Sequence, residues 1–194
     1  METALIIAAV VVVAVVLAAL WWRQERTRRL RSQFGDEYDR TIEESDSRRD
    51  GERDLRERVD RRDELDIVPL SPDAAARYSE EWRGVQERFV DAPAESVAEA
   101  DVLVMQVMRD RGYPVDDFDR RAADVSVDHP DVVSNYRSGH AIADRSRAGE
   151  ADTEELRQAV VHYRSLFEVL LVEDATDHDQ GDDPESEDRL RRAG

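Results

Sequence analysis

Residues 71–114 read SPDAAARYSEEWRGVQERFVDAPAESVAEADVLVMQVMRDRGYP, and the helix signals in this stretch decide the fold. Ser71 before Pro72 is typical of a helix start, because the serine side chain can cap free backbone N–H groups and proline has no N–H to leave unpaired. Gly112, with a proline close behind it, is typical of a helix end. The stretch therefore predicts two consecutive helices, the second of which begins near Pro93.

Apolar side chains recur every three or four residues in these two helices and in the three segments that follow. Such a period places the side chains on one face of a helix. A short helix is expected at 116–124, another between Pro130 and Gly149, and a last one capped by Thr153. The residues expected to face inward are Tyr78, Trp82, Val85, Phe89, Val97, Ala100, Val104, Met108, Phe118, Ala122, Val133, Tyr136, His140, Ala143, Leu156, Val160, Tyr163, Phe167 and Leu170. We therefore predict an all-α fold with a compact bundle of four to five helices over residues 69–172.

Residues 3–22 form an apolar run without a charge, long enough to cross a bilayer. We predict a transmembrane helix over residues 1–22. A cleaved signal peptide is the alternative, but such peptides begin with positive charge, and none precedes this run. The run ends at tryptophans, which prefer the membrane interface, and then meets a cluster of arginines. The predicted membrane-interface residues are Trp21, Trp22, Arg23, Arg26, Arg28, Arg29 and Arg31.

The arginine cluster also predicts the orientation of the chain. Between residues 23 and 31, five arginines and one glutamate give a local charge of +4, and positive charge beside a span stays on the cytoplasmic side. We therefore expect a single-pass protein of the cell membrane, with the lipid bilayer as a partner and most of the chain in the cytoplasm. The same arginines can attract anionic lipid headgroups, although setting the topology would by itself account for them.

Residues 23–68 have the composition of a charged helical stalk. Acidic and basic side chains recur four residues apart, as at Glu52 and Arg56, and such pairs stabilise an exposed helix. One apolar stripe consists of Phe34, Tyr38 and Ile42. Gly35 and Gly51 predict breaks or hinges. The stalk is either a solvated spacer or a coiled-coil dimer, and the spacer is favoured because apolar residues do not fill three or four heptads.

Charge and composition limit the remaining segments and the partners. Residues 173–194 hold nine acidic residues and almost nothing apolar, so we predict a disordered acidic tail. The net charge of −18 argues against nucleic acid as a partner, because nucleic acid is bound through neutralisation of its own negative charge. The absence of cysteine excludes disulfides and zinc–thiolate sites.

Two sets of residues are candidates for a metal site, and each has a simpler explanation. The first set is His129, His140 and His162, which have no local metal-binding spacing. The second set is Asp116, Asp117 and Asp119, which fits the negative first turn of a helix. His140, on an apolar face, is either a buried core histidine or a pH-responsive one. We find no phosphate loop, nucleophile elbow or kinase signature, and we expect no catalytic residue, no cofactor, no metal and no enzymatic activity.

Three segments carry a resemblance to a known group of proteins: LRSQFGDEYDRTIEE from residue 30, YSEEWRGVQERFVDAPAESVAEADVLVMQVMRDRGYP from residue 78 and DHPDVVSNYRSGHAI from residue 128. They resemble uncharacterised single-pass membrane proteins of actinomycetes. The resemblance covers roughly residues 30–170 and implies the same layout of anchor, stalk and bundle. It assigns no activity and no site residue.

Two functions fit these observations. The first is a membrane-anchored helical interaction or scaffold module, in which the stalk or the bundle binds a protein partner or a second copy of the chain. The alternative is a small-ligand sensor or enzyme with a pocket between bundle helices, near Tyr136, His140 and Tyr163.

Overall fold

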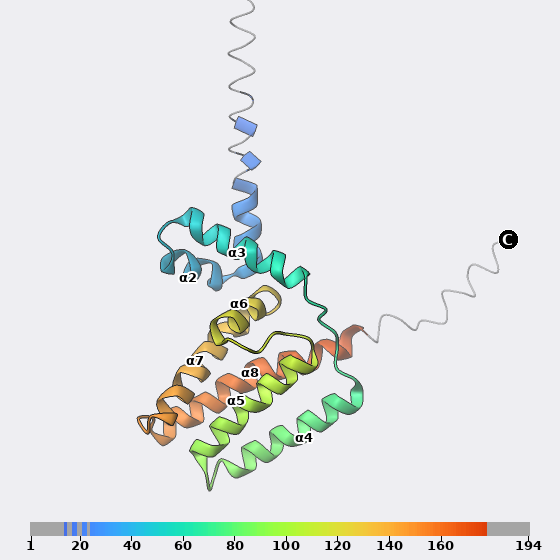
Figure 1. The fold of residues 1–194 in the computed structure, drawn as a ribbon, viewed down its shortest axis with the longest axis vertical. Helices are drawn as coiled ribbons and strands as arrows, with labels where there is room; N and C mark the ends of the chain where they lie inside the picture. The colour runs from blue at the N-terminus through green and yellow to red at the C-terminus, as the bar shows by residue number, and fades with distance from the viewer. Residues whose placement is uncertain (1–13, 15–16, 19–20, 23, 178–194) are drawn as a thin grey trace, which may run out of the picture.

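The structure is a computed structural model that describes residues 14, 17–18, 21–22 and 24–177. All regular secondary structure in these residues is helical, which confirms the predicted all-α class. A helical segment at residues 24–34 is followed by the labelled helices of Figure 1. These are α2 (Asp36–Glu44), α3 (Arg48–Asp63), α4 (Pro72–Arg88), α5 (Pro93–Asp110), α6 (Phe118–Asp128), α7 (Pro130–Arg147) and α8 (Thr153–Asp177).

The predicted transmembrane helix and the predicted acidic tail lie at the two ends of the chain. Most of the predicted transmembrane helix at residues 1–22 lies outside the described residues. Among the described residues, no helix combines the length and the apolar character that crossing a membrane requires. At the other end α8 continues to Asp177, past residue 173, where the predicted acidic tail begins. The rest of that tail, residues 178–194, lies outside the described part of the chain.

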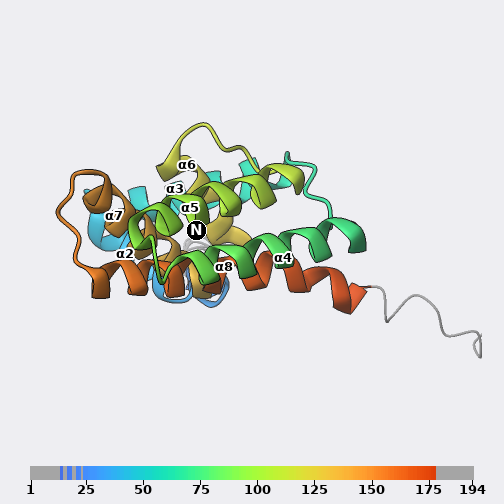
Figure 2. The ribbon, with the colours of Figure 1, turned by 90° about the horizontal axis from the view of Figure 1, so that it is seen from below.

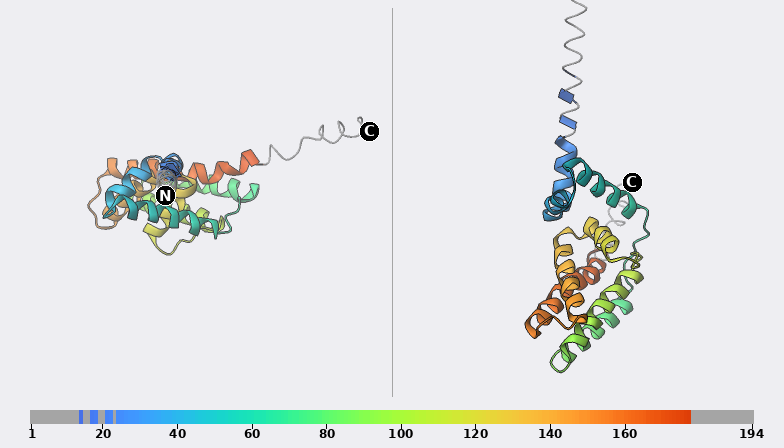
Figure 3. Two further views of the ribbon diagram at one scale, coloured as in Figure 1. Left: turned by 90° about the horizontal axis from the view of Figure 1, so that it is seen from above. Right: turned by 60° about the vertical axis from the view of Figure 1, so that its left-hand side comes forward.

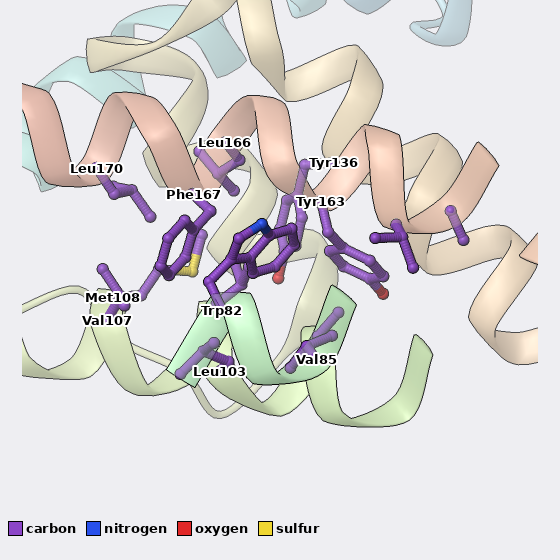
Figure 4. Close-up of a cluster of buried hydrophobic side chains, with 14 of the residues drawn as sticks. Trp82, Val85, Leu103, Val107, Met108, Tyr136, Tyr163, Leu166, Phe167 and Leu170 are labelled. Atoms are coloured by element: carbon purple, nitrogen blue, oxygen red, sulfur yellow. The ribbon is translucent and has the colours of Figure 1, made fainter. Parts of the chain in front are cut away.

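Helices α4 to α8 form the predicted bundle, with α4, α5 and α8 running side by side (Figures 1 and 2). The stripes predicted from the sequence supply its core. Val97, Ala100, Val104 and Met108 of α5 are fully buried, and the ring of Trp82 stacks on Phe167 with centroids 4.6 Å apart. Figure 4 shows these rings between the aliphatic side chains of α5 and α8. Burial of such large apolar side chains is the main favourable term in the stability of the bundle.

The helix ends follow the predicted signals with one correction. The Ser71 side chain accepts a hydrogen bond from the Ala74 backbone N–H, 3.2 Å away, and so caps α4. After α5, Gly112 has a φ of +99°, and a side chain there would meet the carbonyl oxygen of Asp66. The start of α8 is capped by Asp152 and not by Thr153, because the Asp152 carboxylate accepts from the Glu155 N–H at 2.8 Å and Glu155 reciprocates at 2.9 Å.

Residues 24–34, α2 and α3 form a second unit, here called the N-terminal layer, which packs on α6 and α7 (Figures 1 and 3). Its small apolar cluster consists of Leu30, Phe34, Tyr38 and Leu55 with Val127 of α6. Residues 24–63 therefore pack on the bundle, unlike the expected solvated spacer, because their few apolar residues meet in this cluster, against which Ile42 and Val59 also pack. Gly35 is a break with a φ of +51°, as predicted, whereas Gly51 lies inside α3 and is buried.

Candidate functional site

The side of α5 that does not face the core carries two hollows, one on each flank. The first hollow, of about 500 Å³, lies between α4 and α5. The second, of about 390 Å³, lies between α5 and α7. Ala98 and Val102 line both hollows, and Val102 is 47% exposed. We call this surface the α5 face.

The amino-acid sequence of α5 explains why an apolar surface remains there. One stripe of α5, which includes Val97 and Val104, is buried in the bundle. A second stripe at spacings of four, four and three residues consists of Ala94, Ala98, Val102 and Met105. A helix that is apolar on opposite sides is normally covered on both, and α5 has neighbours in the bundle on one side only. This second stripe is visible in the sequence but does not belong to the predicted inward faces.

Carboxylates dominate the charge at the rim of the α5 face. The hollows are edged by Glu80, Glu81, Glu95 and Glu99. Arg88 donates two hydrogen bonds to one oxygen of Glu99, at 2.8 and 2.5 Å, while Glu80 pairs with Arg83 and Glu81 with Arg77. Among the described residues, Glu95 alone of the four has no arginine partner. The face is therefore an apolar strip with a charged border, to which Arg147 also belongs, and no histidine lines either hollow.

The predicted pocket at the centre of the bundle is filled by mutual contacts. Tyr136 and Tyr163 are fully buried. Tyr163 donates a hydrogen bond to Asp101 over 2.9 Å, and the Arg121 guanidinium donates to the Tyr136 hydroxyl over 2.6 Å. Burial raises the pKa of Tyr136 to about 12, although the adjacent guanidinium opposes the shift, so both hydroxyls stay protonated.

His140 lies at the edge of this cluster. Its ring stacks on Phe118 with centroids 3.6 Å apart, and its Nδ1 lies 3.8 Å from a carboxylate oxygen of Asp101. Burial tends to raise the pKa of Asp101, but its interactions with His140 and Tyr163 outweigh burial and lower it. The arrangement is that of a packed polar core in which the Asp101 carboxylate accepts from Tyr163 and the Arg121 guanidinium donates to Tyr136.

The candidate metal residues do not assemble. Within the described residues, no three histidine or acidic side chains are grouped closely enough to hold a metal ion. His162 lies 3.1 Å from the Asn135 side-chain oxygen. Asp117 caps α6, because its carboxylate accepts from the Arg120 N–H at 2.8 Å. The interpretation of this aspartate cluster as helix-start charges is confirmed for Asp117.

The predicted membrane-interface residues lie at the start of the described helix. Trp21 and Trp22 are 67% and 60% exposed, and the Arg26 guanidinium lies over the Trp22 ring at 4.1 Å. The remaining arginines are placed as follows: Arg29 pairs with Glu25, Arg31 pairs with Asp39, Arg28 is exposed, and Arg23 is outside the described residues. These residues form no enclosed site with one another.

A buried carboxylate, which the sequence did not reveal, joins the N-terminal layer to the bundle. The side chain of Glu37 in α2 is 1% exposed and accepts from Arg58 of α3 at 2.7 Å. It also accepts two hydrogen bonds from Arg137 of α7, at 3.0 and 3.1 Å. Burial lowers the pKa of Arg137 while Glu37 opposes that shift. Such a carboxylate between two guanidiniums fixes the position of one helix layer on another.

Comparison of the chain with models of protein families, with curated proteins and with solved structures gives no match. The function is therefore inferred from the α5 face, the Glu37 contact and the arginines at the start of the chain.

Proposed function

We propose that this protein is a membrane-anchored helical interaction module without catalytic activity. In this proposal residues 1–22 hold the chain in the cell membrane as a single pass, and the bundle lies in the cytoplasm. The α5 face then binds a protein partner. The observation that carries the proposal is the half-exposed Val102 between two hollows on a surface that is otherwise highly charged.

The chemistry of the α5 face favours one kind of partner, an amphipathic helix with apolar side chains and basic flanking residues. Hollows of about 500 and 390 Å³ accept side chains from such a helix. Glu95, which has no arginine partner among the described residues, complements lysine or arginine on the partner. A second copy of this chain, with its net charge of −18, would instead bring like charges together.

The Glu37 contact supports the proposal because it gives the docking surface a defined orientation. With Arg58 and Arg137 both bound to Glu37, the bundle is fixed on α2 and α3 and does not swing on a free tether. The loop between α4 and α5 lies at the end of the molecule opposite to residues 24–34 (Figure 1). A membrane anchor would therefore hold α4 and α5 away from the bilayer.

A ligand pocket at Tyr136, His140 and Tyr163 has less support. The two tyrosine hydroxyls are already bonded to Arg121 and Asp101. Neither tyrosine lines the hollows beside α5. We therefore propose no enzymatic or sensor function for this cluster.

Site-specific photo-crosslinking tests the docking proposal with a matched control. A photoreactive amino acid replaces Val102, which is 47% exposed, or Val161 of α8, which is 50% exposed. The full-length protein is expressed and irradiated in cells, and adducts are separated by mass. We expect a discrete adduct from position 102 and none of that mass from position 161. Equal adducts at both positions, or none at position 102, would contradict docking on the α5 face.

Affinity recovery of the crosslinked partner by a tagged copy of the protein, without the photoreactive residue, tests the partner chemistry through one substitution. Val102→Glu adds negative charge to the strip and should abolish recovery of the adduct partner, whereas Val161→Glu should leave recovery unchanged. The orientation of the protein is tested separately. A copy of the protein with a C-terminal tag is placed in sealed membrane vesicles, and protease is added outside. Loss of the tag only in inverted vesicles is expected, and loss in right-side-out vesicles would overturn the cytoplasmic location.

A further inference from the structure

A basic hollow of about 390 Å³ lies where the helical segment at residues 24–34 meets α3. Its lining comes from parts of the chain that are distant in sequence. The residues are Trp22, Arg26 and Leu30 on the first helix and Arg49, Glu52, Arg53 and Arg56 on α3. The α3 residues recur at spacings of three, one and three, which places them on one face of that helix.

Specific hydrogen bonds hold the two walls of the hollow together. Glu52 accepts from Thr27 at 2.9 Å, from Tyr38 at 3.0 Å and from Arg48 at 3.1 Å. Burial tends to raise the pKa of Glu52, but these three donors outweigh burial and lower it. The Glu52 carboxylate is therefore ionised and already engaged, and the buried Leu30 and Leu55 pack beside it.

The arginines of the hollow are left with little negative charge to balance them. Four guanidiniums and one carboxylate give the lining a charge of +3. Among the described residues, Arg49 and Arg56 have no carboxylate partner, and Arg53 pairs only with the exposed Asp50 at 3.0 Å. Guanidinium groups bind phosphate through paired N–H donors, so several of them around one hollow match a phosphate group.

We propose that this hollow binds the phosphate of an anionic lipid headgroup. The position of Trp22 selects a lipid as the source of the phosphate. Its ring, 60% exposed, lines the hollow, and Trp22 is the last residue of the apolar run of residues 3–22. Indole rings settle at the depth of lipid headgroups, which brings the hollow to the same depth. This inference rests on the proposed membrane anchor and gives the arginines of α3 a role that topology does not require.

The experiment compares two full-length double variants with the wild type. Arg49→Gln with Arg56→Gln removes two charges from the hollow. Arg109→Gln with Arg120→Gln removes two charges from exposed positions on α5 and α6 and serves as the control. Each protein is reconstituted in vesicles of phosphatidylcholine mixed with phosphatidylglycerol. The lipids that remain bound after release into mild detergent are then quantified by native mass spectrometry.

The wild type and the control should retain phosphatidylglycerol in preference to phosphatidylcholine. For the hollow variant we expect this preference to fall about fivefold for each arginine removed. A preference that is absent in the wild type, or that falls equally in both variants, would overturn the site. Circular dichroism verifies folding, and if the double variant is unfolded, Arg56→Gln alone should still lower the preference about fivefold.

Two further measurements are needed. One tests the membrane anchor independently of the headgroup site, and the other tests whether the hollow binds free phosphate in place of a lipid. Incorporation of the wild type into pure phosphatidylcholine vesicles measures the anchor alone. Incorporation without phosphatidylglycerol preference would overturn the headgroup site and leave the anchor standing, whereas failure to incorporate would overturn both. Inorganic phosphate should not displace the bound lipid, and displacement at millimolar phosphate would reassign the hollow to a free anion.

Discussion

The bundle and the N-terminal layer are both helical, but they are held together by different interactions. Along α5 and α8 the bundle buries continuous apolar stripes, with Trp82 stacked on Phe167 at its centre. The N-terminal layer buries only a small apolar cluster and meets the bundle through ion pairs of Glu37 with Arg137, Arg61 with Asp124 and Arg62 with Asp128. A charged helix with few apolar positions can thus pack on a neighbour, provided that its charges meet opposite charges there.

The two kinds of contact also differ in what they contribute. Burial of apolar area stabilises the bundle in proportion to the area removed from water. A buried ion pair gains little net stability over an apolar pair of the same shape, because both charges lose their hydration. Loss of one partner is nevertheless costly, since the other charge stays buried without compensation. We infer that apolar packing supplies the stability and that the Glu37 contact supplies the orientation of the layer.

The largest change in stability is expected for a substitution in the apolar core of the bundle. Phe167 is 3% exposed, and Phe167→Ala removes the ring that stacks on Trp82 and leaves a cavity. We expect the free energy of unfolding to fall by about 4 kcal/mol in urea titrations followed by circular dichroism. The control Val90→Ala, at a side chain that is 83% exposed, should change it by less than about 0.5 kcal/mol. Equal losses for the two variants would mean that the bundle centre is not the stabilising core.

The next effect tests the ionic contact. Glu37→Gln leaves Arg58 and Arg137 without their shared carboxylate, and we expect a loss of about 3 kcal/mol. Hydrogen exchange should accelerate in α2 and α3 while α5 and α8 stay protected. The control Glu168→Gln removes one half of an exposed pair with Arg164 and should have little effect. Faster exchange across the whole bundle would contradict a separate N-terminal layer.

Substitution of glycine by alanine should change the stability in opposite directions in the two regions. At Gly51, a methyl group would lie 2.7 Å from a side-chain carbon of Ile42 and 3.2 Å from its backbone Cα, so Gly51→Ala should destabilise the α2–α3 contact by about 1 kcal/mol. At Gly84 of α4 the nearest atom is the flexible end of Arg88, and Gly84→Ala should stabilise by about 0.5 kcal/mol through helix propensity. Thermal melting of both variants measures the difference. The same sign for both would show that the close approach at Gly51 does not constrain the fold.

The last comparison concerns two buried aspartates whose pKa values shift in opposite directions. The pKa of Asp101 in α5 is lowered, so its charge contributes stability above its ordinary pKa, and this contribution is lost as the pH falls through the folded value. Burial raises the pKa of Asp124 in α6, although Arg61 at 3.5 Å opposes the shift. Its contribution is therefore present below the ordinary pKa and is lost as the pH rises through the raised value.

Unfolding measured between about pH 3 and 7 should separate these two carboxylates. At neutral pH, Asp101→Asn should destabilise by about 1 kcal/mol, and the difference from the wild type should shrink below about pH 4. Asp124→Asn should be neutral or slightly stabilising at neutral pH. A destabilising Asp124→Asn would mean that its contact with Arg61 outweighs the cost of burial.

The contrast between the two regions also explains which predictions from the sequence succeeded. The inward faces of α4 and α5 were predicted correctly. Apolar side chains are buried away from water, so the period at which they recur shows which face of a helix is buried. The start at Ser71 was correct because capping depends on neighbouring residues only. The cap of α8 was placed one residue late at Thr153, since Asp152 also supplies a capping oxygen. The period at Tyr136 and Tyr163 predicted their burial but not that Asp101 and Arg121 would bind their hydroxyls.

The sequence by itself determined the all-α class, the order of the helices and the inward face of the bundle, because these depend on signals within four residues of one another. Only the tertiary structure decided that Glu37 meets Arg137, that α5 keeps an uncovered apolar strip, and that arginines of α3 join Arg26 around one hollow. The reason is physical. A charged side chain is stable both in water and beside an opposite charge, so its place in the sequence does not reveal which of the two it will have until the helices have packed.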